Sequence, residues 1–597
     1  MKKLVYFLLL FQASTLQAQD IRWWNPANNE FNVIEGQAWS KSVEQAYDRL
    51  PISAKGQVRE SVWGLSKHSA GLMIRFRSNA SEIKIRYSTH WDKTTPQVDY
   101  GMNHMPATGV SGIDLYTLDA DGNELWCTGT RNFADTIIYT FDGLRSNDKY
   151  HDLGREYRLY LPLYNQVEWL EIGTTDSTFF RPLTVRKDRP IVVYGTSIAQ
   201  GACASRPGMA WTAQLSRKMD RPLINLAFSG NGRLEPEVID YLGQIDAKVF
   251  IFDCLPNLTT LSWDKINIKD GEQLKQIIKK AVRQLRDLKP NTPILLVDHA
   301  GYAEALVKDM RKEAYSIVNQ IQQEAFSELK KEGLTNIHYL SKEEIGFELD
   351  DTVDGTHPND IGMQHYAKAY ETKLRVILKE PIGQASTSKP VIQYREPHKY
   401  DWEDRHIDIL NMNIADPAKT AFFGNSIIHF WGGLPRSETI TEEESWEKYF
   451  TPKGIRNFAY GWDRLENVLW RIYHGELDDI SPNKVTLMIG TNNLHLNTDK
   501  EIVEGLQFII NAIKERQPTS KIILLGILPR RNYEERIVSL NHQIAKLNGV
   551  NYKDLGLVFL KKDKKINEAL FSDGLHPNKA GYEKFREELI TVLNLIK

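Results

Sequence analysis

The chain has 597 residues, of which 41% are hydrophobic and 25% charged, and its formal net charge is -2 at pH 7. This is ordinary globular composition, and at roughly 100–200 residues per domain it predicts three or four domains. The near-neutral charge and the lack of a basic run argue against nucleic acid as a partner. The 3 cysteines have no metal-type spacing and can form at most one disulfide, which excludes a disulfide framework.

The first residues of the chain have the order of features found in a secretory signal peptide. Lys2 and Lys3 precede the apolar run 4–11, which is shorter than the roughly 20 residues of a membrane span, and small residues suited to cleavage end at Ala18. The alternative is a buried N-terminal helix. We therefore expect a signal peptide at 1–18, no transmembrane segment later in the chain, and a secreted or periplasmic bacterial protein.

Residues 20–186 have the pattern of a β domain. Apolar and polar residues alternate along 71–78, 82–89, 135–141 and 157–164. Alternation with a period of two indicates strands that bury one face, and turn-forming clusters separate them. The prediction for 20–186 is a β-sandwich.

The pattern changes near residue 187 to short, continuous apolar runs that alternate with helical stretches. The runs are 190–195, 248–254 and 293–299 in the first such region, and 420–424, 484–490 and 521–529 in the second. Continuous apolar strands between helices indicate a parallel sheet covered on both faces. We predict two α/β domains, at 187–380 and 402–597, joined at 381–401 by a linker or domain-crossing strap.

Each predicted α/β domain carries the same four motifs in the same order, each just after an apolar strand or near the domain's end. They lie at 195–198, 225–231, 253–257 and 354–359 in the first domain, and at 424–427, 457–463, 490–493 and 573–578 in the second. The first and last motifs supply a serine and a histidine that are 160 residues apart in one domain and 150 in the other. Any one of these motifs alone is more often a turn or a helix start. Their repetition in order indicates two catalytic sites.

The residue types fit acyl transfer by a serine nucleophile. A serine hydroxyl becomes nucleophilic when a neighbouring imidazole takes its proton, and a carboxylate holds that imidazole in the required tautomer. Asp and His three positions apart on one short loop can both point at the same strand end. We therefore predict two catalytic sets, which are Ser197, Asp354 and His357, and Ser426, Asp573 and His576.

These motifs resemble the SGNH hydrolase superfamily, named for its Ser, Gly, Asn and His. The matching positions in the first α/β domain are Ser197, Gly230, Asn257 and His357, and in the second they are Ser426, Asn492 and His576. The resemblance implies a flavodoxin-like three-layer fold and an oxyanion hole built from Gly230, Asn257, Trp462 and Asn492. It implies no cofactor, and no cluster of side chains has a metal-type spacing.

Two motifs depart from the family pattern. Trp462 stands at the family's glycine position in the second domain, where a backbone N–H survives but the acyl pocket is expected to be narrowed or lined by the indole. The third motif of the first domain contains Pro256 before Asn257. Residues 457–480 resemble the platelet-activating-factor acetylhydrolase catalytic subunits, which hints at a small acyl group, and Gly112–Tyr116 resembles the GxDLY module of bacterial secreted proteins.

We therefore expect an exported serine esterase that removes O-acetyl or other short acyl groups from a polysaccharide or oligosaccharide. The aromatic residues near the motifs are candidates for a sugar-binding surface, although they are also common core residues: Trp211, Trp431, Tyr460 and Trp462. One alternative is a lipase or lysophospholipase, and another is that one SGNH domain is degenerate and serves as a binding module. The sequence specifies neither the polymer nor the oligomeric state.

Overall fold

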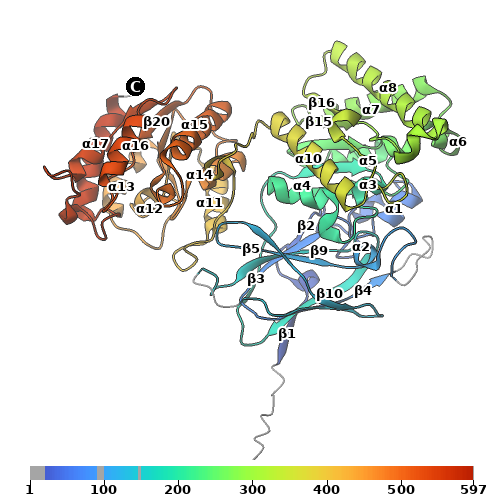
Figure 1. Ribbon diagram of the computed structural model, residues 1–597, viewed down its shortest axis with the longest axis horizontal. Coiled ribbons are helices and arrows are strands. Elements are labelled where there is room, and N and C mark those ends of the chain that lie inside the picture. The colour runs from blue at the N-terminus through green and yellow to red at the C-terminus, as the bar shows by residue number, and fades with distance from the viewer. Residues whose placement is uncertain (1–19, 91–99, 146–149, 596–597) are drawn as a thin grey trace, which may run out of the picture.

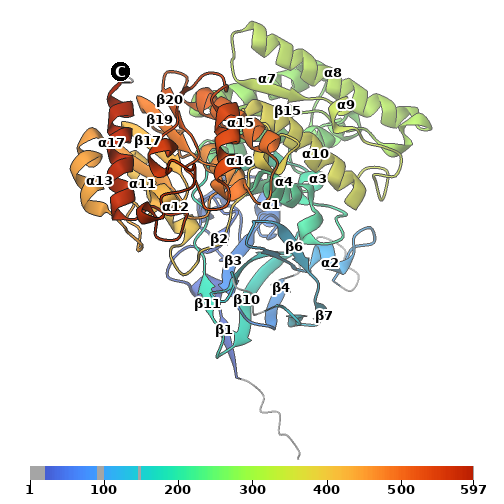
Figure 2. The same cartoon turned by 60° about the vertical axis from the view of Figure 1, so that its left-hand side comes forward.

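The computed structural model describes residues 20–90, 100–145 and 150–595, so the predicted signal peptide at 1–18 lies outside the described residues. Within those ranges, no helix combines the length and the apolar character needed to cross a bilayer. Two antiparallel sheets come first in the chain and two parallel sheets follow. Figures 1 and 2 show the two α/β parts, green to yellow and orange to red, as separate bodies that adjoin the blue N-terminal sheets.

The N-terminal part contains two antiparallel sheets. The first has the order β1 (Ile21–Trp24), β10 (Gln166–Thr175), β4 (Ile83–His90), β8 (Ile137–Phe141) and β7 (Thr130–Asn132). The second has the order β11 (Phe180–Pro182), β3 (Met73–Ser78), β9 (Arg155–Tyr160), β5 (Asp114–Leu118) and β6 (Glu124–Cys127), with β2 (Ile34–Glu35) paired to β3. The four strands predicted from alternation are confirmed as β3, β4, β8 and β9.

Side chains from both N-terminal sheets meet in one apolar core. Ile85 on β4 and Ile172 on β10 belong to the same buried cluster as Phe76 on β3 and Tyr157 on β9. The rings of Phe76 and Tyr157 stack with their centroids 5.4 Å apart. The period-two pattern of the sequence therefore corresponds to residues that face this shared core.

The first parallel sheet has the strand order β13, β12, β14, β15, β16, which is the 2-1-3-4-5 order of flavodoxin-like folds. Its strands are β12 (Ile191–Gly195), β13 (Leu223–Ala227), β14 (Val249–Asp253), β15 (Ile294–Val297) and β16 (Ile337–Leu340). The principal helices are α4 (Trp211–Met219), α5 (Pro236–Leu242), α7 (Gly271–Leu288), α8 (Asp309–Lys331) and α10 (Asp360–Ile377).

Alternate residues of each strand enter two different cores, which produces three layers. Val192 and Tyr194 of β12 pack in the core formed with α5, α7 and α8. Their neighbours Ile191 and Val193 pack in the core formed with α4 and α10. A strand buried on both faces needs apolar residues at every position, which explains the continuous apolar runs in the sequence.

The second parallel sheet repeats the first, with the order β18, β17, β19, β20, β21. Its strands are β17 (Thr420–Gly424), β18 (Ile455–Ala459), β19 (Lys484–Met488), β20 (Lys521–Leu525) and β21 (Asn551–Lys553). Its helices are α11 (Trp402–Ala415), α12 (Ser426–His429), α13 (Glu443–Tyr449), α14 (Leu465–Tyr473), α15 (Asp499–Arg516), α16 (Glu534–Ile544) and α17 (Lys579–Leu595). In α15, the Thr498 and Glu501 side chains form a capping box that fixes where the helix begins.

The segment 381–401 contacts both the N-terminal sheets and the last α/β part. The backbone N–H of Tyr394 donates to the Ala120 carbonyl at 2.9 Å, and the Arg395 guanidinium bonds the Asp121 carboxylate. On its other side, the hydroxyl of Thr387 donates to the carbonyl of Glu501 at 2.8 Å. The segment is therefore held along its length and does not behave as a free tether.

A buried ion pair joins the N-terminal sheets to the last α/β part. Arg75 on β3 is 2% exposed, and its guanidinium donates to both carboxylate oxygens of Glu403 on α11 at 2.9 and 2.7 Å. Its Nε donates to Glu156 on β9 at 3.0 Å. Removing one member of such a set leaves buried charge without a partner, which is more costly than losing a surface pair.

We expect Arg75→Ala to lower the free energy of unfolding by about 3 kcal/mol, because Glu156 and Glu403 lose their shared cation. Arg181→Ala is the matched control, since Arg181 is 44% exposed and pairs with Asp401 and Asp404 of the same interface. Its loss should cost less than about 1 kcal/mol. Urea unfolding of the full chain measures both, and equal effects would contradict the assignment of Arg75 as the buried anchor.

Candidate active site

The structure brings the three residues of the first predicted catalytic set together. Ser197 lies two residues after the end of β12 and is the first residue of the short helix α3 (Ser197–Gln200), which the side chain of Thr196 caps. The Ser197 hydroxyl lies 2.9 Å from His357 Nε2, and His357 Nδ1 lies 2.8 Å from Asp354 Oδ2. A carboxylate only accepts hydrogen bonds, so the proton is on Nδ1 and Nε2 is free to accept from the serine.

The second set has the same geometry. The Ser426 hydroxyl lies 2.8 Å from His576 Nε2, and His576 Nδ1 lies 2.7 Å from Asp573 Oδ2. Ser426 follows β17 and begins α12, and the side chain of Asn425 caps this helix. Both serines are almost completely buried, with exposed fractions of 9% for Ser197 and 5% for Ser426.

Hydrogen bonds within the loops 354–357 and 573–576 favour the ionised form of Asp354 and Asp573. Oδ1 of Asp354 accepts hydrogen bonds from the N–H groups of Thr356 and His357 at 3.0 and 2.8 Å. Burial raises the pKa of Asp354, but these bonds and the His357 side chain outweigh it and leave the pKa below its ordinary value. Burial likewise raises the pKa of Asp573, and bonds from His576 and its loop lower it to about 2.

A buried asparagine ties the nucleophile helix to the second strand in both halves. Asn225 on β13 donates from Nδ2 to the carbonyl of Ala199, two residues after the first serine, at 2.8 Å. Asn457 on β18 donates in the same way to the carbonyl of Ile428, two residues after the second serine, at 2.8 Å. Both belong to the second motif, but the sequence interpretation gave them no role.

In both halves a buried arginine donates hydrogen bonds to backbone carbonyls of this second strand. Arg49 donates to two carbonyls at the end of β13, at 3.0 and 2.8 Å, and Arg405 donates to the two matching carbonyls of β18, both at 3.0 Å. Arg405 comes from α11 beside its own sheet. Arg49 comes from the N-terminal part, 148 residues before Ser197, and no local pattern in the sequence marks it.

The second motif has the same backbone conformation in both halves despite the change of residue. Gly230 has φ +69° and Trp462 has φ +60°. The left-handed region suits glycine and costs other residues roughly 1–2 kcal/mol. Trp462 therefore matches Gly230 in backbone φ as well as in its place in the motif.

The third motif is hydrogen-bonded to the second. Oδ1 of Asn257 accepts from the N–H of Gly232 at 3.0 Å, which leaves its Nδ2 group directed elsewhere. In the other half, Asn492 Nδ2 donates to the carbonyl of Asp463 at 3.0 Å and retains a second hydrogen. These bonds hold together, in each half, the two loops that carry its two predicted oxyanion residues.

A pocket of about 570 Å³ opens above Ser197 and is walled largely by the N-terminal part. Its lining includes residues of α1 (Glu60–Leu65), together with His68, Met102 and His104. No pattern in the sequence indicates that residues more than 90 positions upstream of Ser197 line the first site.

Of the four aromatic residues that the sequence left open between a sugar surface and the core, three are core residues. Trp211, Trp431 and Tyr460 are each 0% exposed and belong to the apolar cores. Trp211 stacks on Tyr370 of α10 with their centroids 4.2 Å apart. They lie close to the motifs in sequence, but their rings fill the layers beneath the strand ends. Trp462 is the exception and is half-buried.

A glycine that the sequence analysis did not single out packs against the strand end that carries Ser197. A Cβ at Gly232 would lie 2.2 Å from the carbonyl oxygen of Gly195, whereas a Cβ at Gly230 would meet no atom within 4 Å. Gly232→Ala should therefore shift the Ser197 turn, while Gly230→Ala should cost only the left-handed backbone, about 1 kcal/mol. Unfolding of the two variants and labelling of Ser197 by a fluorophosphonate test this, and a milder effect for Gly232→Ala would contradict it.

Comparisons with known proteins match all three parts of the chain. Models of the GDSL-like lipase/acylhydrolase family match residues 188–375 and 422–584, and the model of the N-terminal module of SGNH-hydrolase-type esterases, GxDLY, matches 21–180.

The chain is 31% identical over 197 residues to human platelet-activating factor acetylhydrolase IB subunit alpha2, which covers 32% of this chain and 77% of that protein. It is 30% identical over 172 residues to the human alpha1 subunit, which covers 28% and 70%. A solved structure described as a GDSL-like lipase, from Bacteroides ovatus ATCC 8483, covers 60% of this chain and 98% of its own, with 30% identity and a TM-score of 0.53. The chain belongs to the GDSL-like lipase/acylhydrolase family and carries two domains of that family after a GxDLY module.

Proposed function

We propose that this protein is an exported serine esterase that removes O-acetyl or other short acyl groups from a polysaccharide or oligosaccharide at two sites. The observation that carries the proposal is the repeated Ser–His–Asp set, with Ser-to-His distances of 2.9 and 2.8 Å and His-to-Asp distances of 2.8 and 2.7 Å. Family membership supports acyl hydrolysis, and the repeated geometry supports activity in both halves.

In the proposed reaction, Ser197 or Ser426 attacks the ester carbonyl carbon while the histidine Nε2 takes the hydroxyl proton. The imidazolium is stabilised by the ionised aspartate on Nδ1. When the tetrahedral intermediate collapses, the histidine returns the proton to the departing sugar oxygen and leaves an acyl-enzyme. A water molecule, deprotonated by the same histidine, then hydrolyses this ester and restores the serine.

The oxyanion of each tetrahedral intermediate needs donors that are already in place. We assign the backbone N–H groups of Ser197 and Gly230 and the Nδ2 group of Asn257 to the first site. The second site would use the N–H groups of Ser426 and Trp462 and the remaining Nδ2 hydrogen of Asn492. Loss of one such donor typically costs about 3–4 kcal/mol of transition-state stabilisation.

Different observations support the proposed acyl group of the substrate and its proposed sugar alcohol. The names of the acetylhydrolase relatives support a short acyl group. The first pocket presents polar side chains from Glu60, Ser61, His68, His104 and Asn231 beside the serine. These side chains offer donors and acceptors to a hydroxyl-rich sugar, next to an apolar part of the wall that includes Leu65 and Met102.

The decisive test is release of acetate from acetylated xylan, mannan and pectin by the wild type, Ser197→Ala, Ser426→Ala and the double variant. Each single variant should lose the contribution of one site, and the double variant should fall by about 10³-fold or more because no nucleophile remains. Wild-type activity in the double variant would contradict the proposal. An effect of only one serine would identify the other domain as a binding module.

Assays of the wild type and its three serine variants on two model esters distinguish a sugar esterase from a lipase. Nitrophenyl acetate and nitrophenyl decanoate share a leaving group, so their kcat/KM ratio reports the acyl pocket alone. We expect the acetate to be the better substrate at both sites. A preference for decanoate at either site would favour the lipase or lysophospholipase alternative for that site.

Asp573→Asn should separate catalysis from stability. The folded pKa of about 2 lies below the unfolded value of about 3.9. The carboxylate therefore stabilises the fold above about pH 4, and this contribution is lost as pH falls towards 2. Because the Asp573 side chain is 54% exposed, the gain is at most about 1 kcal/mol after solvent screening.

In a Ser197→Ala background, Asp573→Asn should lower kcat by about 10³- to 10⁴-fold at neutral pH, because the imidazole loses its oriented tautomer. Its destabilisation in urea should be small and should shrink below pH 4. A loss of kcat no larger than the loss of folded protein would contradict a role in the reaction.

A further inference from the structure

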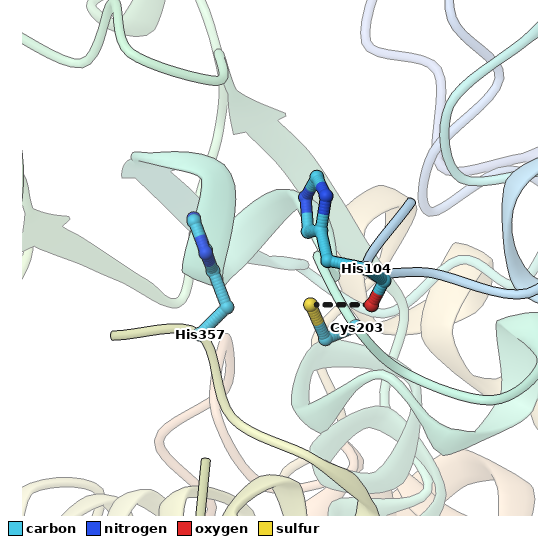
Figure 3. Close-up of side chains that lie close together, drawn as sticks. All are labelled: His104, Cys203 and His357. Carbon is cyan, nitrogen blue, oxygen red and sulfur yellow. Dashed lines mark hydrogen bonds between the residues drawn. The ribbon is translucent and has the colours of Figure 1, made fainter. Parts of the chain in front are cut away.

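Three potential metal ligands converge at the first site. His104, Cys203 and His357 each offer one ligand atom, and these atoms all lie within 4.8 Å of one another. Figure 3 shows the thiol below the His104 ring and the His357 imidazole across from both, and Cys203 itself follows α3 in the chain. Since the residues belong to three distant segments, no spacing motif reveals them in the sequence.

The separation is close to what a tetrahedral cation needs. Zn–N bonds of about 2.0 Å and Zn–S bonds of about 2.3 Å place tetrahedral ligand atoms roughly 3.3–3.6 Å apart. Small side-chain rotations close the remaining gap, and His104 is exposed and free to make them. The pocket leaves room for water as a fourth ligand.

The backbone holds the thiol in place. Cys203 has φ +69°, which is uncommon for a residue other than glycine, and its thiol donates to the carbonyl oxygen of His104 at 3.2 Å. The sulfur is therefore directed at the segment that supplies the first imidazole.

Cation binding and catalysis exclude one another at His357. Its Nδ1 is bonded to Asp354 and its Nε2 to Ser197, so whichever nitrogen binds a cation must give up one of these bonds. A metal on Nε2 removes the base that takes the serine proton. A metal on Nδ1 removes the carboxylate that orients the ring.

We propose that a thiophilic divalent cation of the Zn²⁺ class binds His104, Cys203 and His357 and reversibly inhibits the first site while the second continues to work. The inhibition rests on the proposed function of Ser197, whereas the binding itself does not. The N-terminal module thus supplies a ligand through which metal ions regulate one of the two sites.

The second site is a control built into the same chain. The ring beside His576 is Phe430, with centroids 6.1 Å apart, whereas the ring beside His357 is His104 at 5.7 Å. Gly432 stands six residues after Ser426, where Cys203 stands six residues after Ser197. Across the described ranges, only the first site gathers three such ligands.

The test labels the full-length protein with a fluorophosphonate across a Zn²⁺ titration and quantifies the Ser197 and Ser426 peptides separately. Zinc should suppress labelling of Ser197 and spare Ser426, and EDTA should restore it. Cys203→Ala and Cys203→Ser should each raise the half-inhibiting zinc concentration by about tenfold or more, since a ligand is lost. Cys127→Ala, a buried cysteine on β6, should respond like the parent.

Cobalt provides a readout that does not depend on activity. Co²⁺ should give a thiolate-to-metal charge-transfer band that is present in the parent and in Ser197→Ala and absent in Cys203→Ala. Equal inhibition of both serines by zinc, or unchanged inhibition in both Cys203 variants, would overturn the proposal. Absence of the cobalt band would overturn it as well. Failure of Ser197 to react without zinc would instead contradict the proposed function, while the cobalt band would still report the metal site.

Discussion

The hydrogen bond of the buried asparagine in the middle of the second strand is the interaction on which each site depends. Asn225 and Asn457 bond the helix that carries the serine to the strand that leads into the second motif, with matching Nδ2-to-carbonyl distances of 2.8 Å. Because all strands of a sheet run in parallel, their carboxyl ends meet at one edge, where the histidine loop also arrives. A single edge of the sheet thus sets the positions of the serine, the histidine and the second loop together.

The two halves differ in which part of the chain supplies the arginine that bonds the second strand. In the last domain, Arg405 of its own α11 closes the end of β18. In the first, the equivalent guanidinium is Arg49 of the N-terminal part, which also supplies α1 and His104 to the pocket wall. The GxDLY module is therefore a structural component of the first site, whereas the arginine bonded to the matching strand of the second site comes from its own domain.

The sequence predicted features that local patterns or chain order encode. Continuous apolar strands indicated parallel sheets, and motifs placed after them indicated which serine would meet which histidine. The Asp and His of each acidic loop are three residues apart, so their contact follows from a single turn. The role of Arg49, the wall containing His104 and the burial of Trp211 were not predicted, because each depends on how distant segments pack. An indole near a strand end has the same sequence signature whether it faces a ligand or the layer below.

Trp462 has a left-handed backbone conformation although it stands where the family pattern has glycine. A tryptophan at φ +60° carries a backbone cost that glycine avoids, and such a cost persists only where the surroundings determine the conformation. The next residue, Asp463, is 0% exposed and accepts from Trp402 at 2.9 Å and from Arg471 at 3.0 Å. Arg395 donates to the Trp462 carbonyl at 3.3 Å. These contacts hold the backbone of the loop around Trp462, which explains why a residue other than glycine keeps a positive φ there.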